Sequence, residues 1–180
     1  MTRGRTHAAA LVAALLLAAC AAVPPASPPS ADTLSGRLAV KVDGIDGAAP
    51  RSLSAAFELS GDSQAGRLNL STPLGSMLAQ ARWVPGSVVL ATPKGETRFA
   101  DLDALTYEVL GESVPVAALF DWLRGRPWPG ARSTATPAPG EPGFEQLGWV
   151  VSLAHFDDAS IDARRLRPPA VTVRAKLDRP

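Results

Sequence analysis

Apolar and polar residues alternate along most of the chain from residue 34 onward. In the first segment, Leu38, Val40 and Val42 share one side of an extended chain, while Arg37 and Lys41 share the other. The same two-residue period recurs over 53–59, 68–71, 77–83, 88–90, 149–153 and 171–177. Such alternation is typical of antiparallel strands with one buried and one solvated face. The sequence therefore predicts a largely antiparallel sheet.

Short turn signals separate several of these segments. They are Gly61-Asp62, Pro85-Gly86 and Lys94-Gly95, and dipeptides of this kind favour tight turns. Within 77–83, the alternation places Met77 on the same face as Ala79. Residues 126–143 are rich in Pro, Gly, Ser and Thr and are predicted to form a long loop.

Two segments with a helical period interrupt the sheet pattern. The first, 101–110, starts at an aspartate that suits an N-terminal cap and stops before Gly111. The second, 115–124, starts at a proline, which suits the first helical position, and stops before Gly125. Its apolar stripe consists of Val116, Leu119, Phe120 and Leu123, with Trp122 beside it. Strands on both sides of two short helices indicate an α+β fold, with the helices over one face or one open end of a curved sheet.

The first twenty residues have the features of a secretory signal that ends in a cysteine. Arg3 and Arg5 precede an apolar run over 8–19, which is too short to cross a bilayer. The segment Leu17-Ala18-Ala19-Cys20 resembles a bacterial lipobox, and this resemblance implies cleavage before the cysteine and its acylation. A plain signal peptide would instead leave an unpaired thiol in an oxidising compartment. We therefore expect a lipid-anchored protein outside the cytoplasm.

Composition divides the chain into three parts. Residues 1–19 form the signal peptide, residues 20–33 form a lipidated Pro/Ala/Ser tether, and residues 34–180 are expected to form one domain. Ala21 follows the cysteine, where inner-membrane lipoproteins of enterobacterial type carry aspartate, and this favours the outer membrane. Removal of the signal takes two arginines with it and changes the formal net charge from +1 to −1. No basic stripe is present, which argues against a nucleic-acid partner.

The mature chain offers little catalytic chemistry. His155 is its only histidine, which excludes a histidine-rich metal site, and we interpret it as a strand-end residue rather than a general base. Asp157 and Asp158 would point to opposite faces of an extended chain, which argues against a cooperating pair. No nucleophile elbow, P-loop or Rossmann fingerprint is present. We expect no enzyme activity, no metal and no cofactor, so that any transport runs downhill.

One loop is unusual because it combines turn residues with an apolar one. Pro73 and Gly75 force a turn between two strand-like segments and push Leu74 outward. Burial of one leucine contributes about 1.5–3 kcal/mol, enough to bias a loop toward lipid but not to anchor a protein. A single exposed leucine is also ordinary on a protein surface. The residues alone leave both interpretations open.

Four short motifs in this order, together with the lipobox, resemble the LolB family of outer-membrane lipoprotein receptors. They are Gly36-Arg37-Leu38-Ala39-Val40, Leu68-x-Leu70-x-x-Pro73-Leu74-Gly75, Pro115 through Trp122-Leu123-x-Gly125-x-Pro127, and Phe144-x-Gln146-x-Gly148-Trp149-x-Val151. The likeness covers about 34–177. The chain departs from the family at Phe57-Glu58-Leu59, where Phe-x-Trp is common, although Leu59 keeps that face apolar.

The resemblance implies an incomplete, half-open antiparallel β-barrel whose short helices cover an apolar cavity. It implies a monomer, anchored through Cys20 at the periplasmic face of the outer membrane. This receptor would accept acylated lipoproteins from a LolA-like periplasmic carrier and insert them into outer-membrane lipid. Pro73, Leu74 and Gly75 match the family's membrane-insertion loop. With the alternation, the resemblance gives these expected cavity residues: Leu38, Val40, Phe57, Leu59, Leu68, Leu70, Leu119, Trp122, Leu123, Trp149 and Val151.

Two other classes of function compete with this interpretation. A structural or assembly lipoprotein of the outer membrane would bind other proteins through sheet edges or Leu74, and its interior would be solid core. An acyl-lipid hydrolase fits less well, because no nucleophile–base pair is visible in the sequence.

Overall fold

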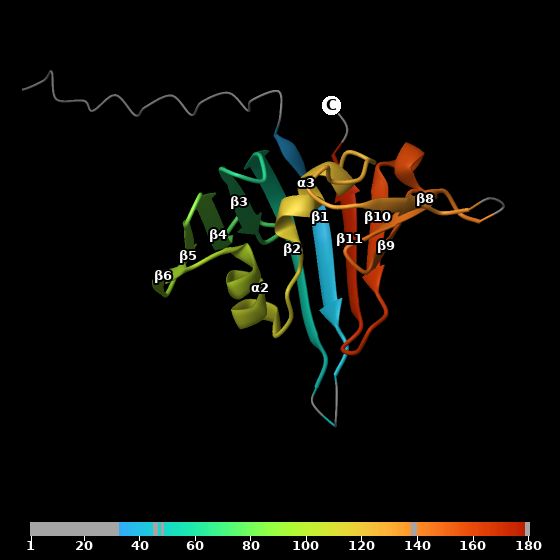
Figure 1. Cartoon of the computed structure of the whole chain (residues 1–180). Coiled ribbons are helices and arrows are strands. Elements are labelled where there is room, and N and C mark those ends of the chain that lie inside the picture. Colours follow the sequence, from blue (N-terminus) through green and yellow to red (C-terminus); the bar gives the residue numbers. More distant parts are fainter. Residues whose placement is uncertain (1–32, 45–46, 48, 138–139, 179–180) are drawn as a thin grey trace, which may run out of the picture.

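The computed structural model describes residues 33–44, 47, 49–137 and 140–178. They form one mostly antiparallel sheet of eleven strands with two short helices (Figure 1). The predicted signal peptide, Cys20 and all of the tether but its last residue lie outside the described residues. None of the helices in the described part of the chain is long and apolar enough to cross a membrane.

Six strands precede the helices and five follow them. The strands are β1 (Leu34–Val42), β2 (Arg51–Gly61), β3 (Gly66–Ser71), β4 (Met77–Val84), β5 (Ser87–Thr92), β6 (Gly95–Phe99), β7 (Ser133–Ala135), β8 (Gly143–Gln146), β9 (Trp149–Ser152), β10 (Ser160–Arg165) and β11 (Val171–Leu177). The helices are α2 (Leu102–Leu110) and α3 (Val116–Trp122), and a short 3-10 turn, η1 (Phe156–Asp158), precedes β10.

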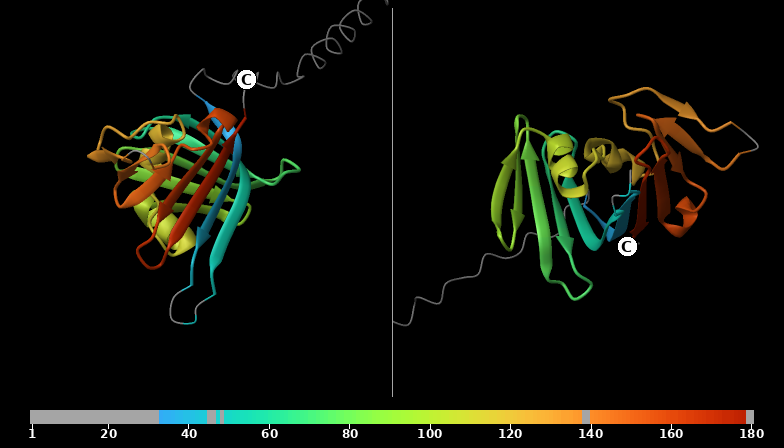
Figure 2. Two further views of the ribbon diagram at one scale, coloured as in Figure 1. Left: turned by 90° about the vertical axis from the view of Figure 1, so that its right-hand side faces the viewer. Right: turned by 90° about the horizontal axis from the view of Figure 1, so that it is seen from below.

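The sheet is curved and open, with the order β6-β5-β4-β3-β2-β1-β11-β10-β9-β8-β7. The first strand pairs with the last, so β1 and β11 join two halves of the sheet at its centre. Strands β6 and β7 form the opposite edges, and the described residues show no pairing between them. Helices α2 and α3 connect one edge to the other. The chain therefore crosses the concave side there, and the helices lie within the curve (Figures 1 and 2).

The seam between the two halves depends on a glycine. Gly36 lies opposite Leu177 of β11 and Phe57 of β2. A Cβ atom at this position would overlap the carbonyl oxygen of Lys176. Only glycine allows the neighbouring backbone this close. The close approach of β11 therefore explains why the motif Gly36-Arg37-Leu38 begins with glycine.

The two predicted helices are present. The Asp101 side chain accepts a hydrogen bond from the backbone N–H of Ala104 at 2.7 Å, which caps α2. Gly111 ends that helix in a left-handed conformation, and its N–H donates to the carbonyl of Tyr107. Helix α3 is shorter than the predicted range 115–124, because its last turn gives way to a tighter turn.

The sequence pattern missed four strands, and two of them form the edges of the sheet. Strand β7 lies within 126–143, so the prediction of one long loop is wrong there. All residues of β7 are exposed, and an edge strand without a buried face carries no alternation to detect. Strands β6, β8 and β10 were also not predicted. Asp157 and Asp158 lie in η1 rather than in an extended chain.

The predicted orientation of Met77 is wrong because β4 contains a bulge. Leu70 pairs with Ala79, but the next residue, Ser71, pairs with Met77, which leaves Leu78 as the extra residue. Met77 therefore shares the outward row with Ser71, and Leu78 turns toward the concave side. Bulges re-aim side chains in this way and recur beside functional sites.

Candidate functional site

The concave side holds an apolar pocket of about 350 Å³ between the N-terminal half of the sheet and the two helices. Inward residues of β1 to β5 form one wall, and α2, α3 and the segment between them form the other. The lining includes Leu38, Val40, Leu68, Leu70, Ala81, Leu90, Leu105, Leu110, Val114 and Leu119. The polar residues in this lining are Thr92 and Thr106. The pocket therefore offers almost only hydrocarbon to a ligand.

The hydroxyl of Thr106 does not make this pocket polar, because its hydrogen bonds are used within the helix region. Its Oγ1 lies 3.1 Å from the carbonyl oxygens of both Leu102 and Asp103. It also accepts a hydrogen bond from the backbone N–H of Val114 at 3.1 Å. Thr106 thus ties the α2–α3 connection to α2. Nothing in the sequence pattern singled this residue out.

The apolar space continues beneath α3. A second, smaller cavity of about 40 Å³ shares Leu38, Leu68 and Leu119 with the first pocket. Its further lining includes Phe57, Leu59 and Leu123. Leu119 contacts both spaces, so this face of α3 forms part of the roof over the hollow half of the sheet.

The predicted cavity residues fall into two groups. Eight of them line the pocket or its extension, namely Leu38, Val40, Phe57, Leu59, Leu68, Leu70, Leu119 and Leu123. Trp122, Trp149 and Val151 line neither space. They are at most 2% exposed and belong to the part of the hydrophobic core that lies on the C-terminal side. The sequence did not assign Leu105, Val109, Leu110 or Leu78 to the lining, because helix orientation and the bulge place them.

The packed core is built around Trp122. Its ring contacts Phe144 and Trp149, with centroids 6.4 and 6.0 Å away. Its Nε1–H donates to Oε1 of Gln146 at 2.8 Å. Gln146 also accepts from the N–H of Trp128 and donates to the carbonyls of Trp128 and Ala131. This buried amide therefore fixes α3 and the segment after it on the C-terminal half of the sheet.

A buried ion pair holds the connection between the two helices. Arg165 is 5% exposed, and its Nη2 lies 2.6 Å from Oε2 of Glu112. The guanidinium also lies over the ring of Trp149, 5.7 Å from its centroid. Because Glu112 lies two residues after the end of α2, this pair attaches the roof of the pocket to β10.

The β3–β4 loop presents Leu74 to solvent. Its side chain is 94% exposed, the highest value among the large hydrophobic residues that the structure describes. The loop is closed at its base, where the N–H of Thr72 donates to the carbonyl of Ser76 and the N–H of Gly75 to that of Thr72, both at 2.9 Å. Ser76 N–H also donates to Oγ1 of Thr72. Gly75 has a positive φ of 84°, which favours glycine. The loop projects from the sheet (Figure 2).

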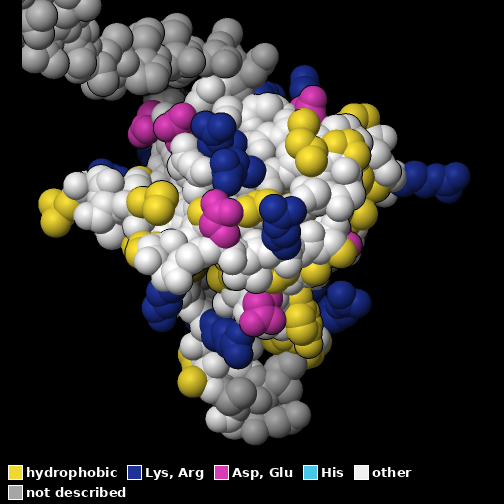
Figure 3. Space-filling model, turned by 90° about the vertical axis from the view of Figure 1, so that its left-hand side faces the viewer, with side chains coloured by type: hydrophobic (Ala, Val, Ile, Leu, Met, Phe, Trp, Pro, Cys, Tyr) yellow, Lys and Arg dark blue, Asp and Glu magenta, His cyan; other side chains and the backbone are white. Residues whose placement is uncertain are grey.

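Exposed apolar residues continue from this loop to the rim of the pocket. Met77 is 49% exposed, and the pocket residues Leu78 and Val109 are 36% and 46% exposed. Figure 3 views the molecule from the β6 side and shows hydrophobic side chains in several groups among scattered Lys and Arg.

Catalytic and metal chemistry is sparse in the described part of the chain. It contains no group of three or more His, Cys, Asp or Glu residues that could hold a metal ion. His155 is exposed and lies directly before η1, just beyond the end of β9.

Comparison with known proteins gives a family for this arrangement. The family model described as outer membrane lipoprotein LolB matches residues 31–177. The chain belongs to the LolB family. The resemblance predicted from the sequence motifs is thereby confirmed, and the open antiparallel α+β fold is the one observed.

Individual LolB proteins show the same relationship. The proteins called outer-membrane lipoprotein LolB in Bordetella petrii and Bordetella pertussis are each 38% identical to this chain, over 127 and 126 residues. Each match covers 68% of this chain and 63% of the relative. The protein of that name in Cupriavidus metallidurans is 36% identical over 115 residues, which are 62% of this chain and 54% of the relative. The chain thus spans less than two thirds of the length of these relatives.

Proposed function

We propose that this chain is an outer-membrane-anchored receptor for lipoproteins. It accepts them from a LolA-like periplasmic carrier by binding their acyl chains and inserts them into the outer membrane. The observation that carries the proposal is the apolar pocket of about 350 Å³ beneath α2 and α3 in a chain of the LolB family. The names of the relatives, which call them outer-membrane lipoproteins, support the location.

The pocket suits an acyl chain because it offers apolar contact without competing polar groups. Each buried CH₂ group contributes about 0.8 kcal/mol, so a lipoprotein cannot cross the aqueous periplasm with its chains exposed. Transfer from a carrier to this pocket requires only tighter binding, and about 1.4 kcal/mol gives a tenfold preference. Release follows because a bilayer accepts the chains better still. No energy source is required.

The Leu74 loop supports the release step. Its hydrogen-bonded base and Gly75 hold the turn in place, so little conformational entropy is lost when the loop enters lipid. Burial of Leu74 would contribute about 1.5–3 kcal/mol. In this proposal Pro73, Leu74 and Gly75 form the membrane-insertion loop, and Leu78 and Val109 at the rim lie on the path of the acyl chain.

The anchor completes the proposal. Residues 1–19 are a signal peptide, Cys20 carries the lipid, residues 20–33 tether the domain, and residues 34–180 form the acyl-binding domain. A single acyl chain binds a membrane only marginally, whereas two or more chains on one cysteine anchor a protein stably. The tether would let the domain move between carrier and bilayer.

The test is a transfer assay with the full lipidated chain in vesicles. A purified acylated lipoprotein on its carrier is added, and its movement to the chain and then into lipid is measured. A version of the cargo without acyl chains serves as the control. Movement that requires the acyl chains supports the receptor. Equal binding of both cargoes, or no movement, would favour a structural or assembly lipoprotein instead.

A matched pair of substitutions tests the loop. Leu74→Glu removes the apolar tip, and Leu166→Glu makes the same change at another exposed leucine, which is 75% exposed. We expect Leu74→Glu to leave the fold intact and to slow insertion into vesicles roughly tenfold to a hundredfold, from the lost burial of one leucine. Leu166→Glu should insert cargo normally. Equal behaviour of the two variants would remove Leu74 from the mechanism.

A further inference from the structure

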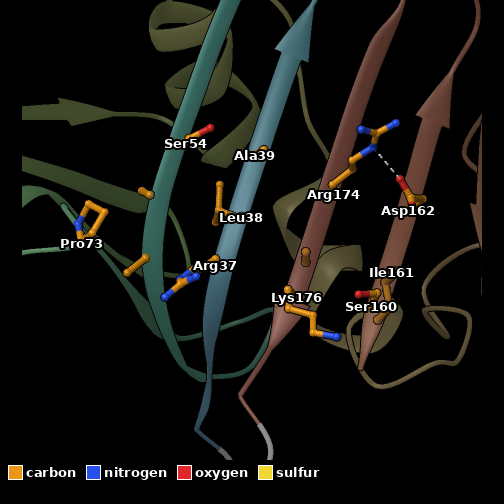
Figure 4. A pocket seen from close by; sticks show the side chains of 13 residues that line it. Arg37, Leu38, Ala39, Ser54, Pro73, Ser160, Ile161, Asp162, Arg174 and Lys176 are labelled. Carbon is orange, nitrogen blue, oxygen red and sulfur yellow. Dashed lines mark hydrogen bonds and ion pairs between the residues drawn. The ribbon is translucent and has the colours of Figure 1, made fainter. Parts of the chain in front are cut away.

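The outer face of the sheet carries a second hollow, on the opposite side from the apolar pocket. This outer groove has a volume of about 420 Å³ and crosses β2, β1, β11 and β10. Ala39, Ser54 and Ala56 are small outward residues in its lining, and they leave room between the longer side chains. Figure 4 shows the groove with its lining residues.

The charged groups of the outer groove are mostly cationic. Three cations, Arg37, Arg174 and Lys176, line it together with one carboxylate, Asp162. Arg174 donates from Nε to Oδ1 of Asp162 at 2.9 Å, so this pair is locally neutral. Lys176 donates from Nζ to the backbone carbonyl oxygen of Asp158. Arg37 and Lys176 also line an adjoining hollow with Asp158 and Asp178, but in the described part of the chain neither carboxylate forms an ion pair with them. For Arg37, the described residues provide no ion-pair or hydrogen-bond partner.

The strand register places two of these cations directly opposite each other. Arg37 of β1 pairs with Lys176 of β11. Like charges at such positions destabilise a sheet. Their side chains lean in opposite directions in Figure 4, which separates the charges and keeps the floor between them open. An anion in the groove would turn this repulsion into two attractive contacts.

The position of the groove points to the source of that anion. Pro73, the residue before Leu74, belongs to the groove lining. Ser71 at the start of the loop pairs with Ala56, and Ala56 pairs with Arg37. A bilayer that receives Leu74 therefore lies beside this cationic surface. Phospholipid phosphates are the anions at the surface of such a bilayer.

We propose that the outer groove binds the headgroup phosphate of an anionic phospholipid through Arg37 and Lys176 while Leu74 enters the bilayer. The outer face of β2, β1, β11 and β10 then lies toward the membrane. A guanidinium and an ammonium both form charge-assisted hydrogen bonds to phosphate. The inference rests on the membrane engagement proposed above for the loop.

The test uses the reactivity of lysine amines in the full lipidated chain. The chain is placed in vesicles of phosphatidylcholine alone or of phosphatidylcholine with phosphatidylglycerol. Acylation of each lysine by a water-soluble reagent is followed by mass spectrometry. We expect Lys176 to react several-fold more slowly with phosphatidylglycerol present, and high salt to remove the difference. Lys94, an exposed lysine in the β5–β6 turn, serves as the control site and should not change.

Substitutions and added ligands identify the source of any protection. Arg37→Gln should abolish protection of Lys176, whereas Arg98→Gln, the same charge loss on exposed β6, should retain it. Equal slowing at Lys176 and Lys94 would mean general attraction to the surface and would overturn the site. Protection in phosphatidylcholine vesicles by inorganic phosphate, or by the carrier protein, would overturn the lipid assignment.

The same preparation separates this inference from the receptor function. Transfer of acylated cargo from the carrier is measured in parallel. Normal transfer without protection of Lys176 would refute the headgroup site and leave the receptor standing. Protection of Lys176 without transfer would support the headgroup site and refute the receptor.

Discussion

The inner faces of the two halves of the sheet differ in how densely they are packed. On the N-terminal side, leucines, valines and alanines of β1 to β5 surround an open apolar space. On the C-terminal side, Trp122, Phe144, Trp149 and Val151 fill the corresponding volume, and Gln146 satisfies the polar atoms there. Both halves are antiparallel, and strands in both alternate with period two.

This difference separates the half of the sheet that stabilises the fold from the half that would bind a ligand. Helix α3 lies over the boundary, with Leu119 toward the hollow side and Trp122 toward the filled side. A close-packed core gives dispersion contacts and a defined position for the helix. A hollow half has fewer of these contacts and is therefore less stabilising, but it leaves space for a ligand. The filled half thus holds the roof in place over the half that would bind acyl chains.

The largest expected effect comes from truncating the two faces of α3. Trp122→Ala should lower the free energy of unfolding by about 3–5 kcal/mol, since it opens a cavity in close packing. Leu119→Ala should cost less than about 2 kcal/mol, because its neighbours already border empty space. Urea unfolding of the two variants measures both values, with Trp122→Phe as a milder control. Similar losses at both positions would contradict the distinction between a filled and a hollow half.

A smaller effect on stability but a clear effect on binding is expected from filling the pocket. Ala79→Phe puts a ring into the hollow half, and Ala91→Phe puts the same ring on the outer face of the adjacent strand β5. Ala79→Phe should change the free energy of unfolding by no more than about 2 kcal/mol. It should weaken uptake of a hydrophobic fluorophore that fatty acid displaces by at least about tenfold. Unchanged uptake in Ala79→Phe, relative to Ala91→Phe, would place the fluorophore elsewhere.

The smallest effect concerns the β2–β3 turn beside the hollow half. The backbone N–H groups of Ala65 and Gln64 donate to the Asp62 carboxylate and hold its pKa below the ordinary value of 3.8. A folded-state pKa below the unfolded one means that the carboxylate stabilises the fold above about pH 4. This contribution is lost as the pH falls through the folded-state pKa.

Substitution of the same residue measures that contribution. The turn also positions Trp83, whose Nε1–H donates to the Asp62 carbonyl at 3.0 Å. Asp62→Asn should be slightly less stable than the parent chain at neutral pH, and the difference should shrink below the ordinary pKa. Urea unfolding at a series of pH values follows it. A difference that stays constant with pH would remove the carboxylate charge as its cause.

Several features were predictable because they depend on local chemistry. The caps Asp101 and Gly111, the turn at Gly61-Asp62 and the exposed tip Leu74 all follow from residue types at short spacing. Strand β7 was missed because an exposed edge strand has no buried face. The inward turn of Leu78 was missed because one extra residue in β4 reverses the alternation.

The sequence by itself determined the antiparallel α+β fold, the family and the inward strand faces of the hollow half, because period-two alternation fixes which side chains share a face. The tertiary structure alone decided which of those faces is filled. Trp149 and Val151 of β9 alternate in the same manner as Leu38 and Val40 of β1, yet only the latter border free space. Whether a buried face becomes core or pocket depends on how large side chains from distant strands and helices meet, and no local pattern encodes that sum of volumes.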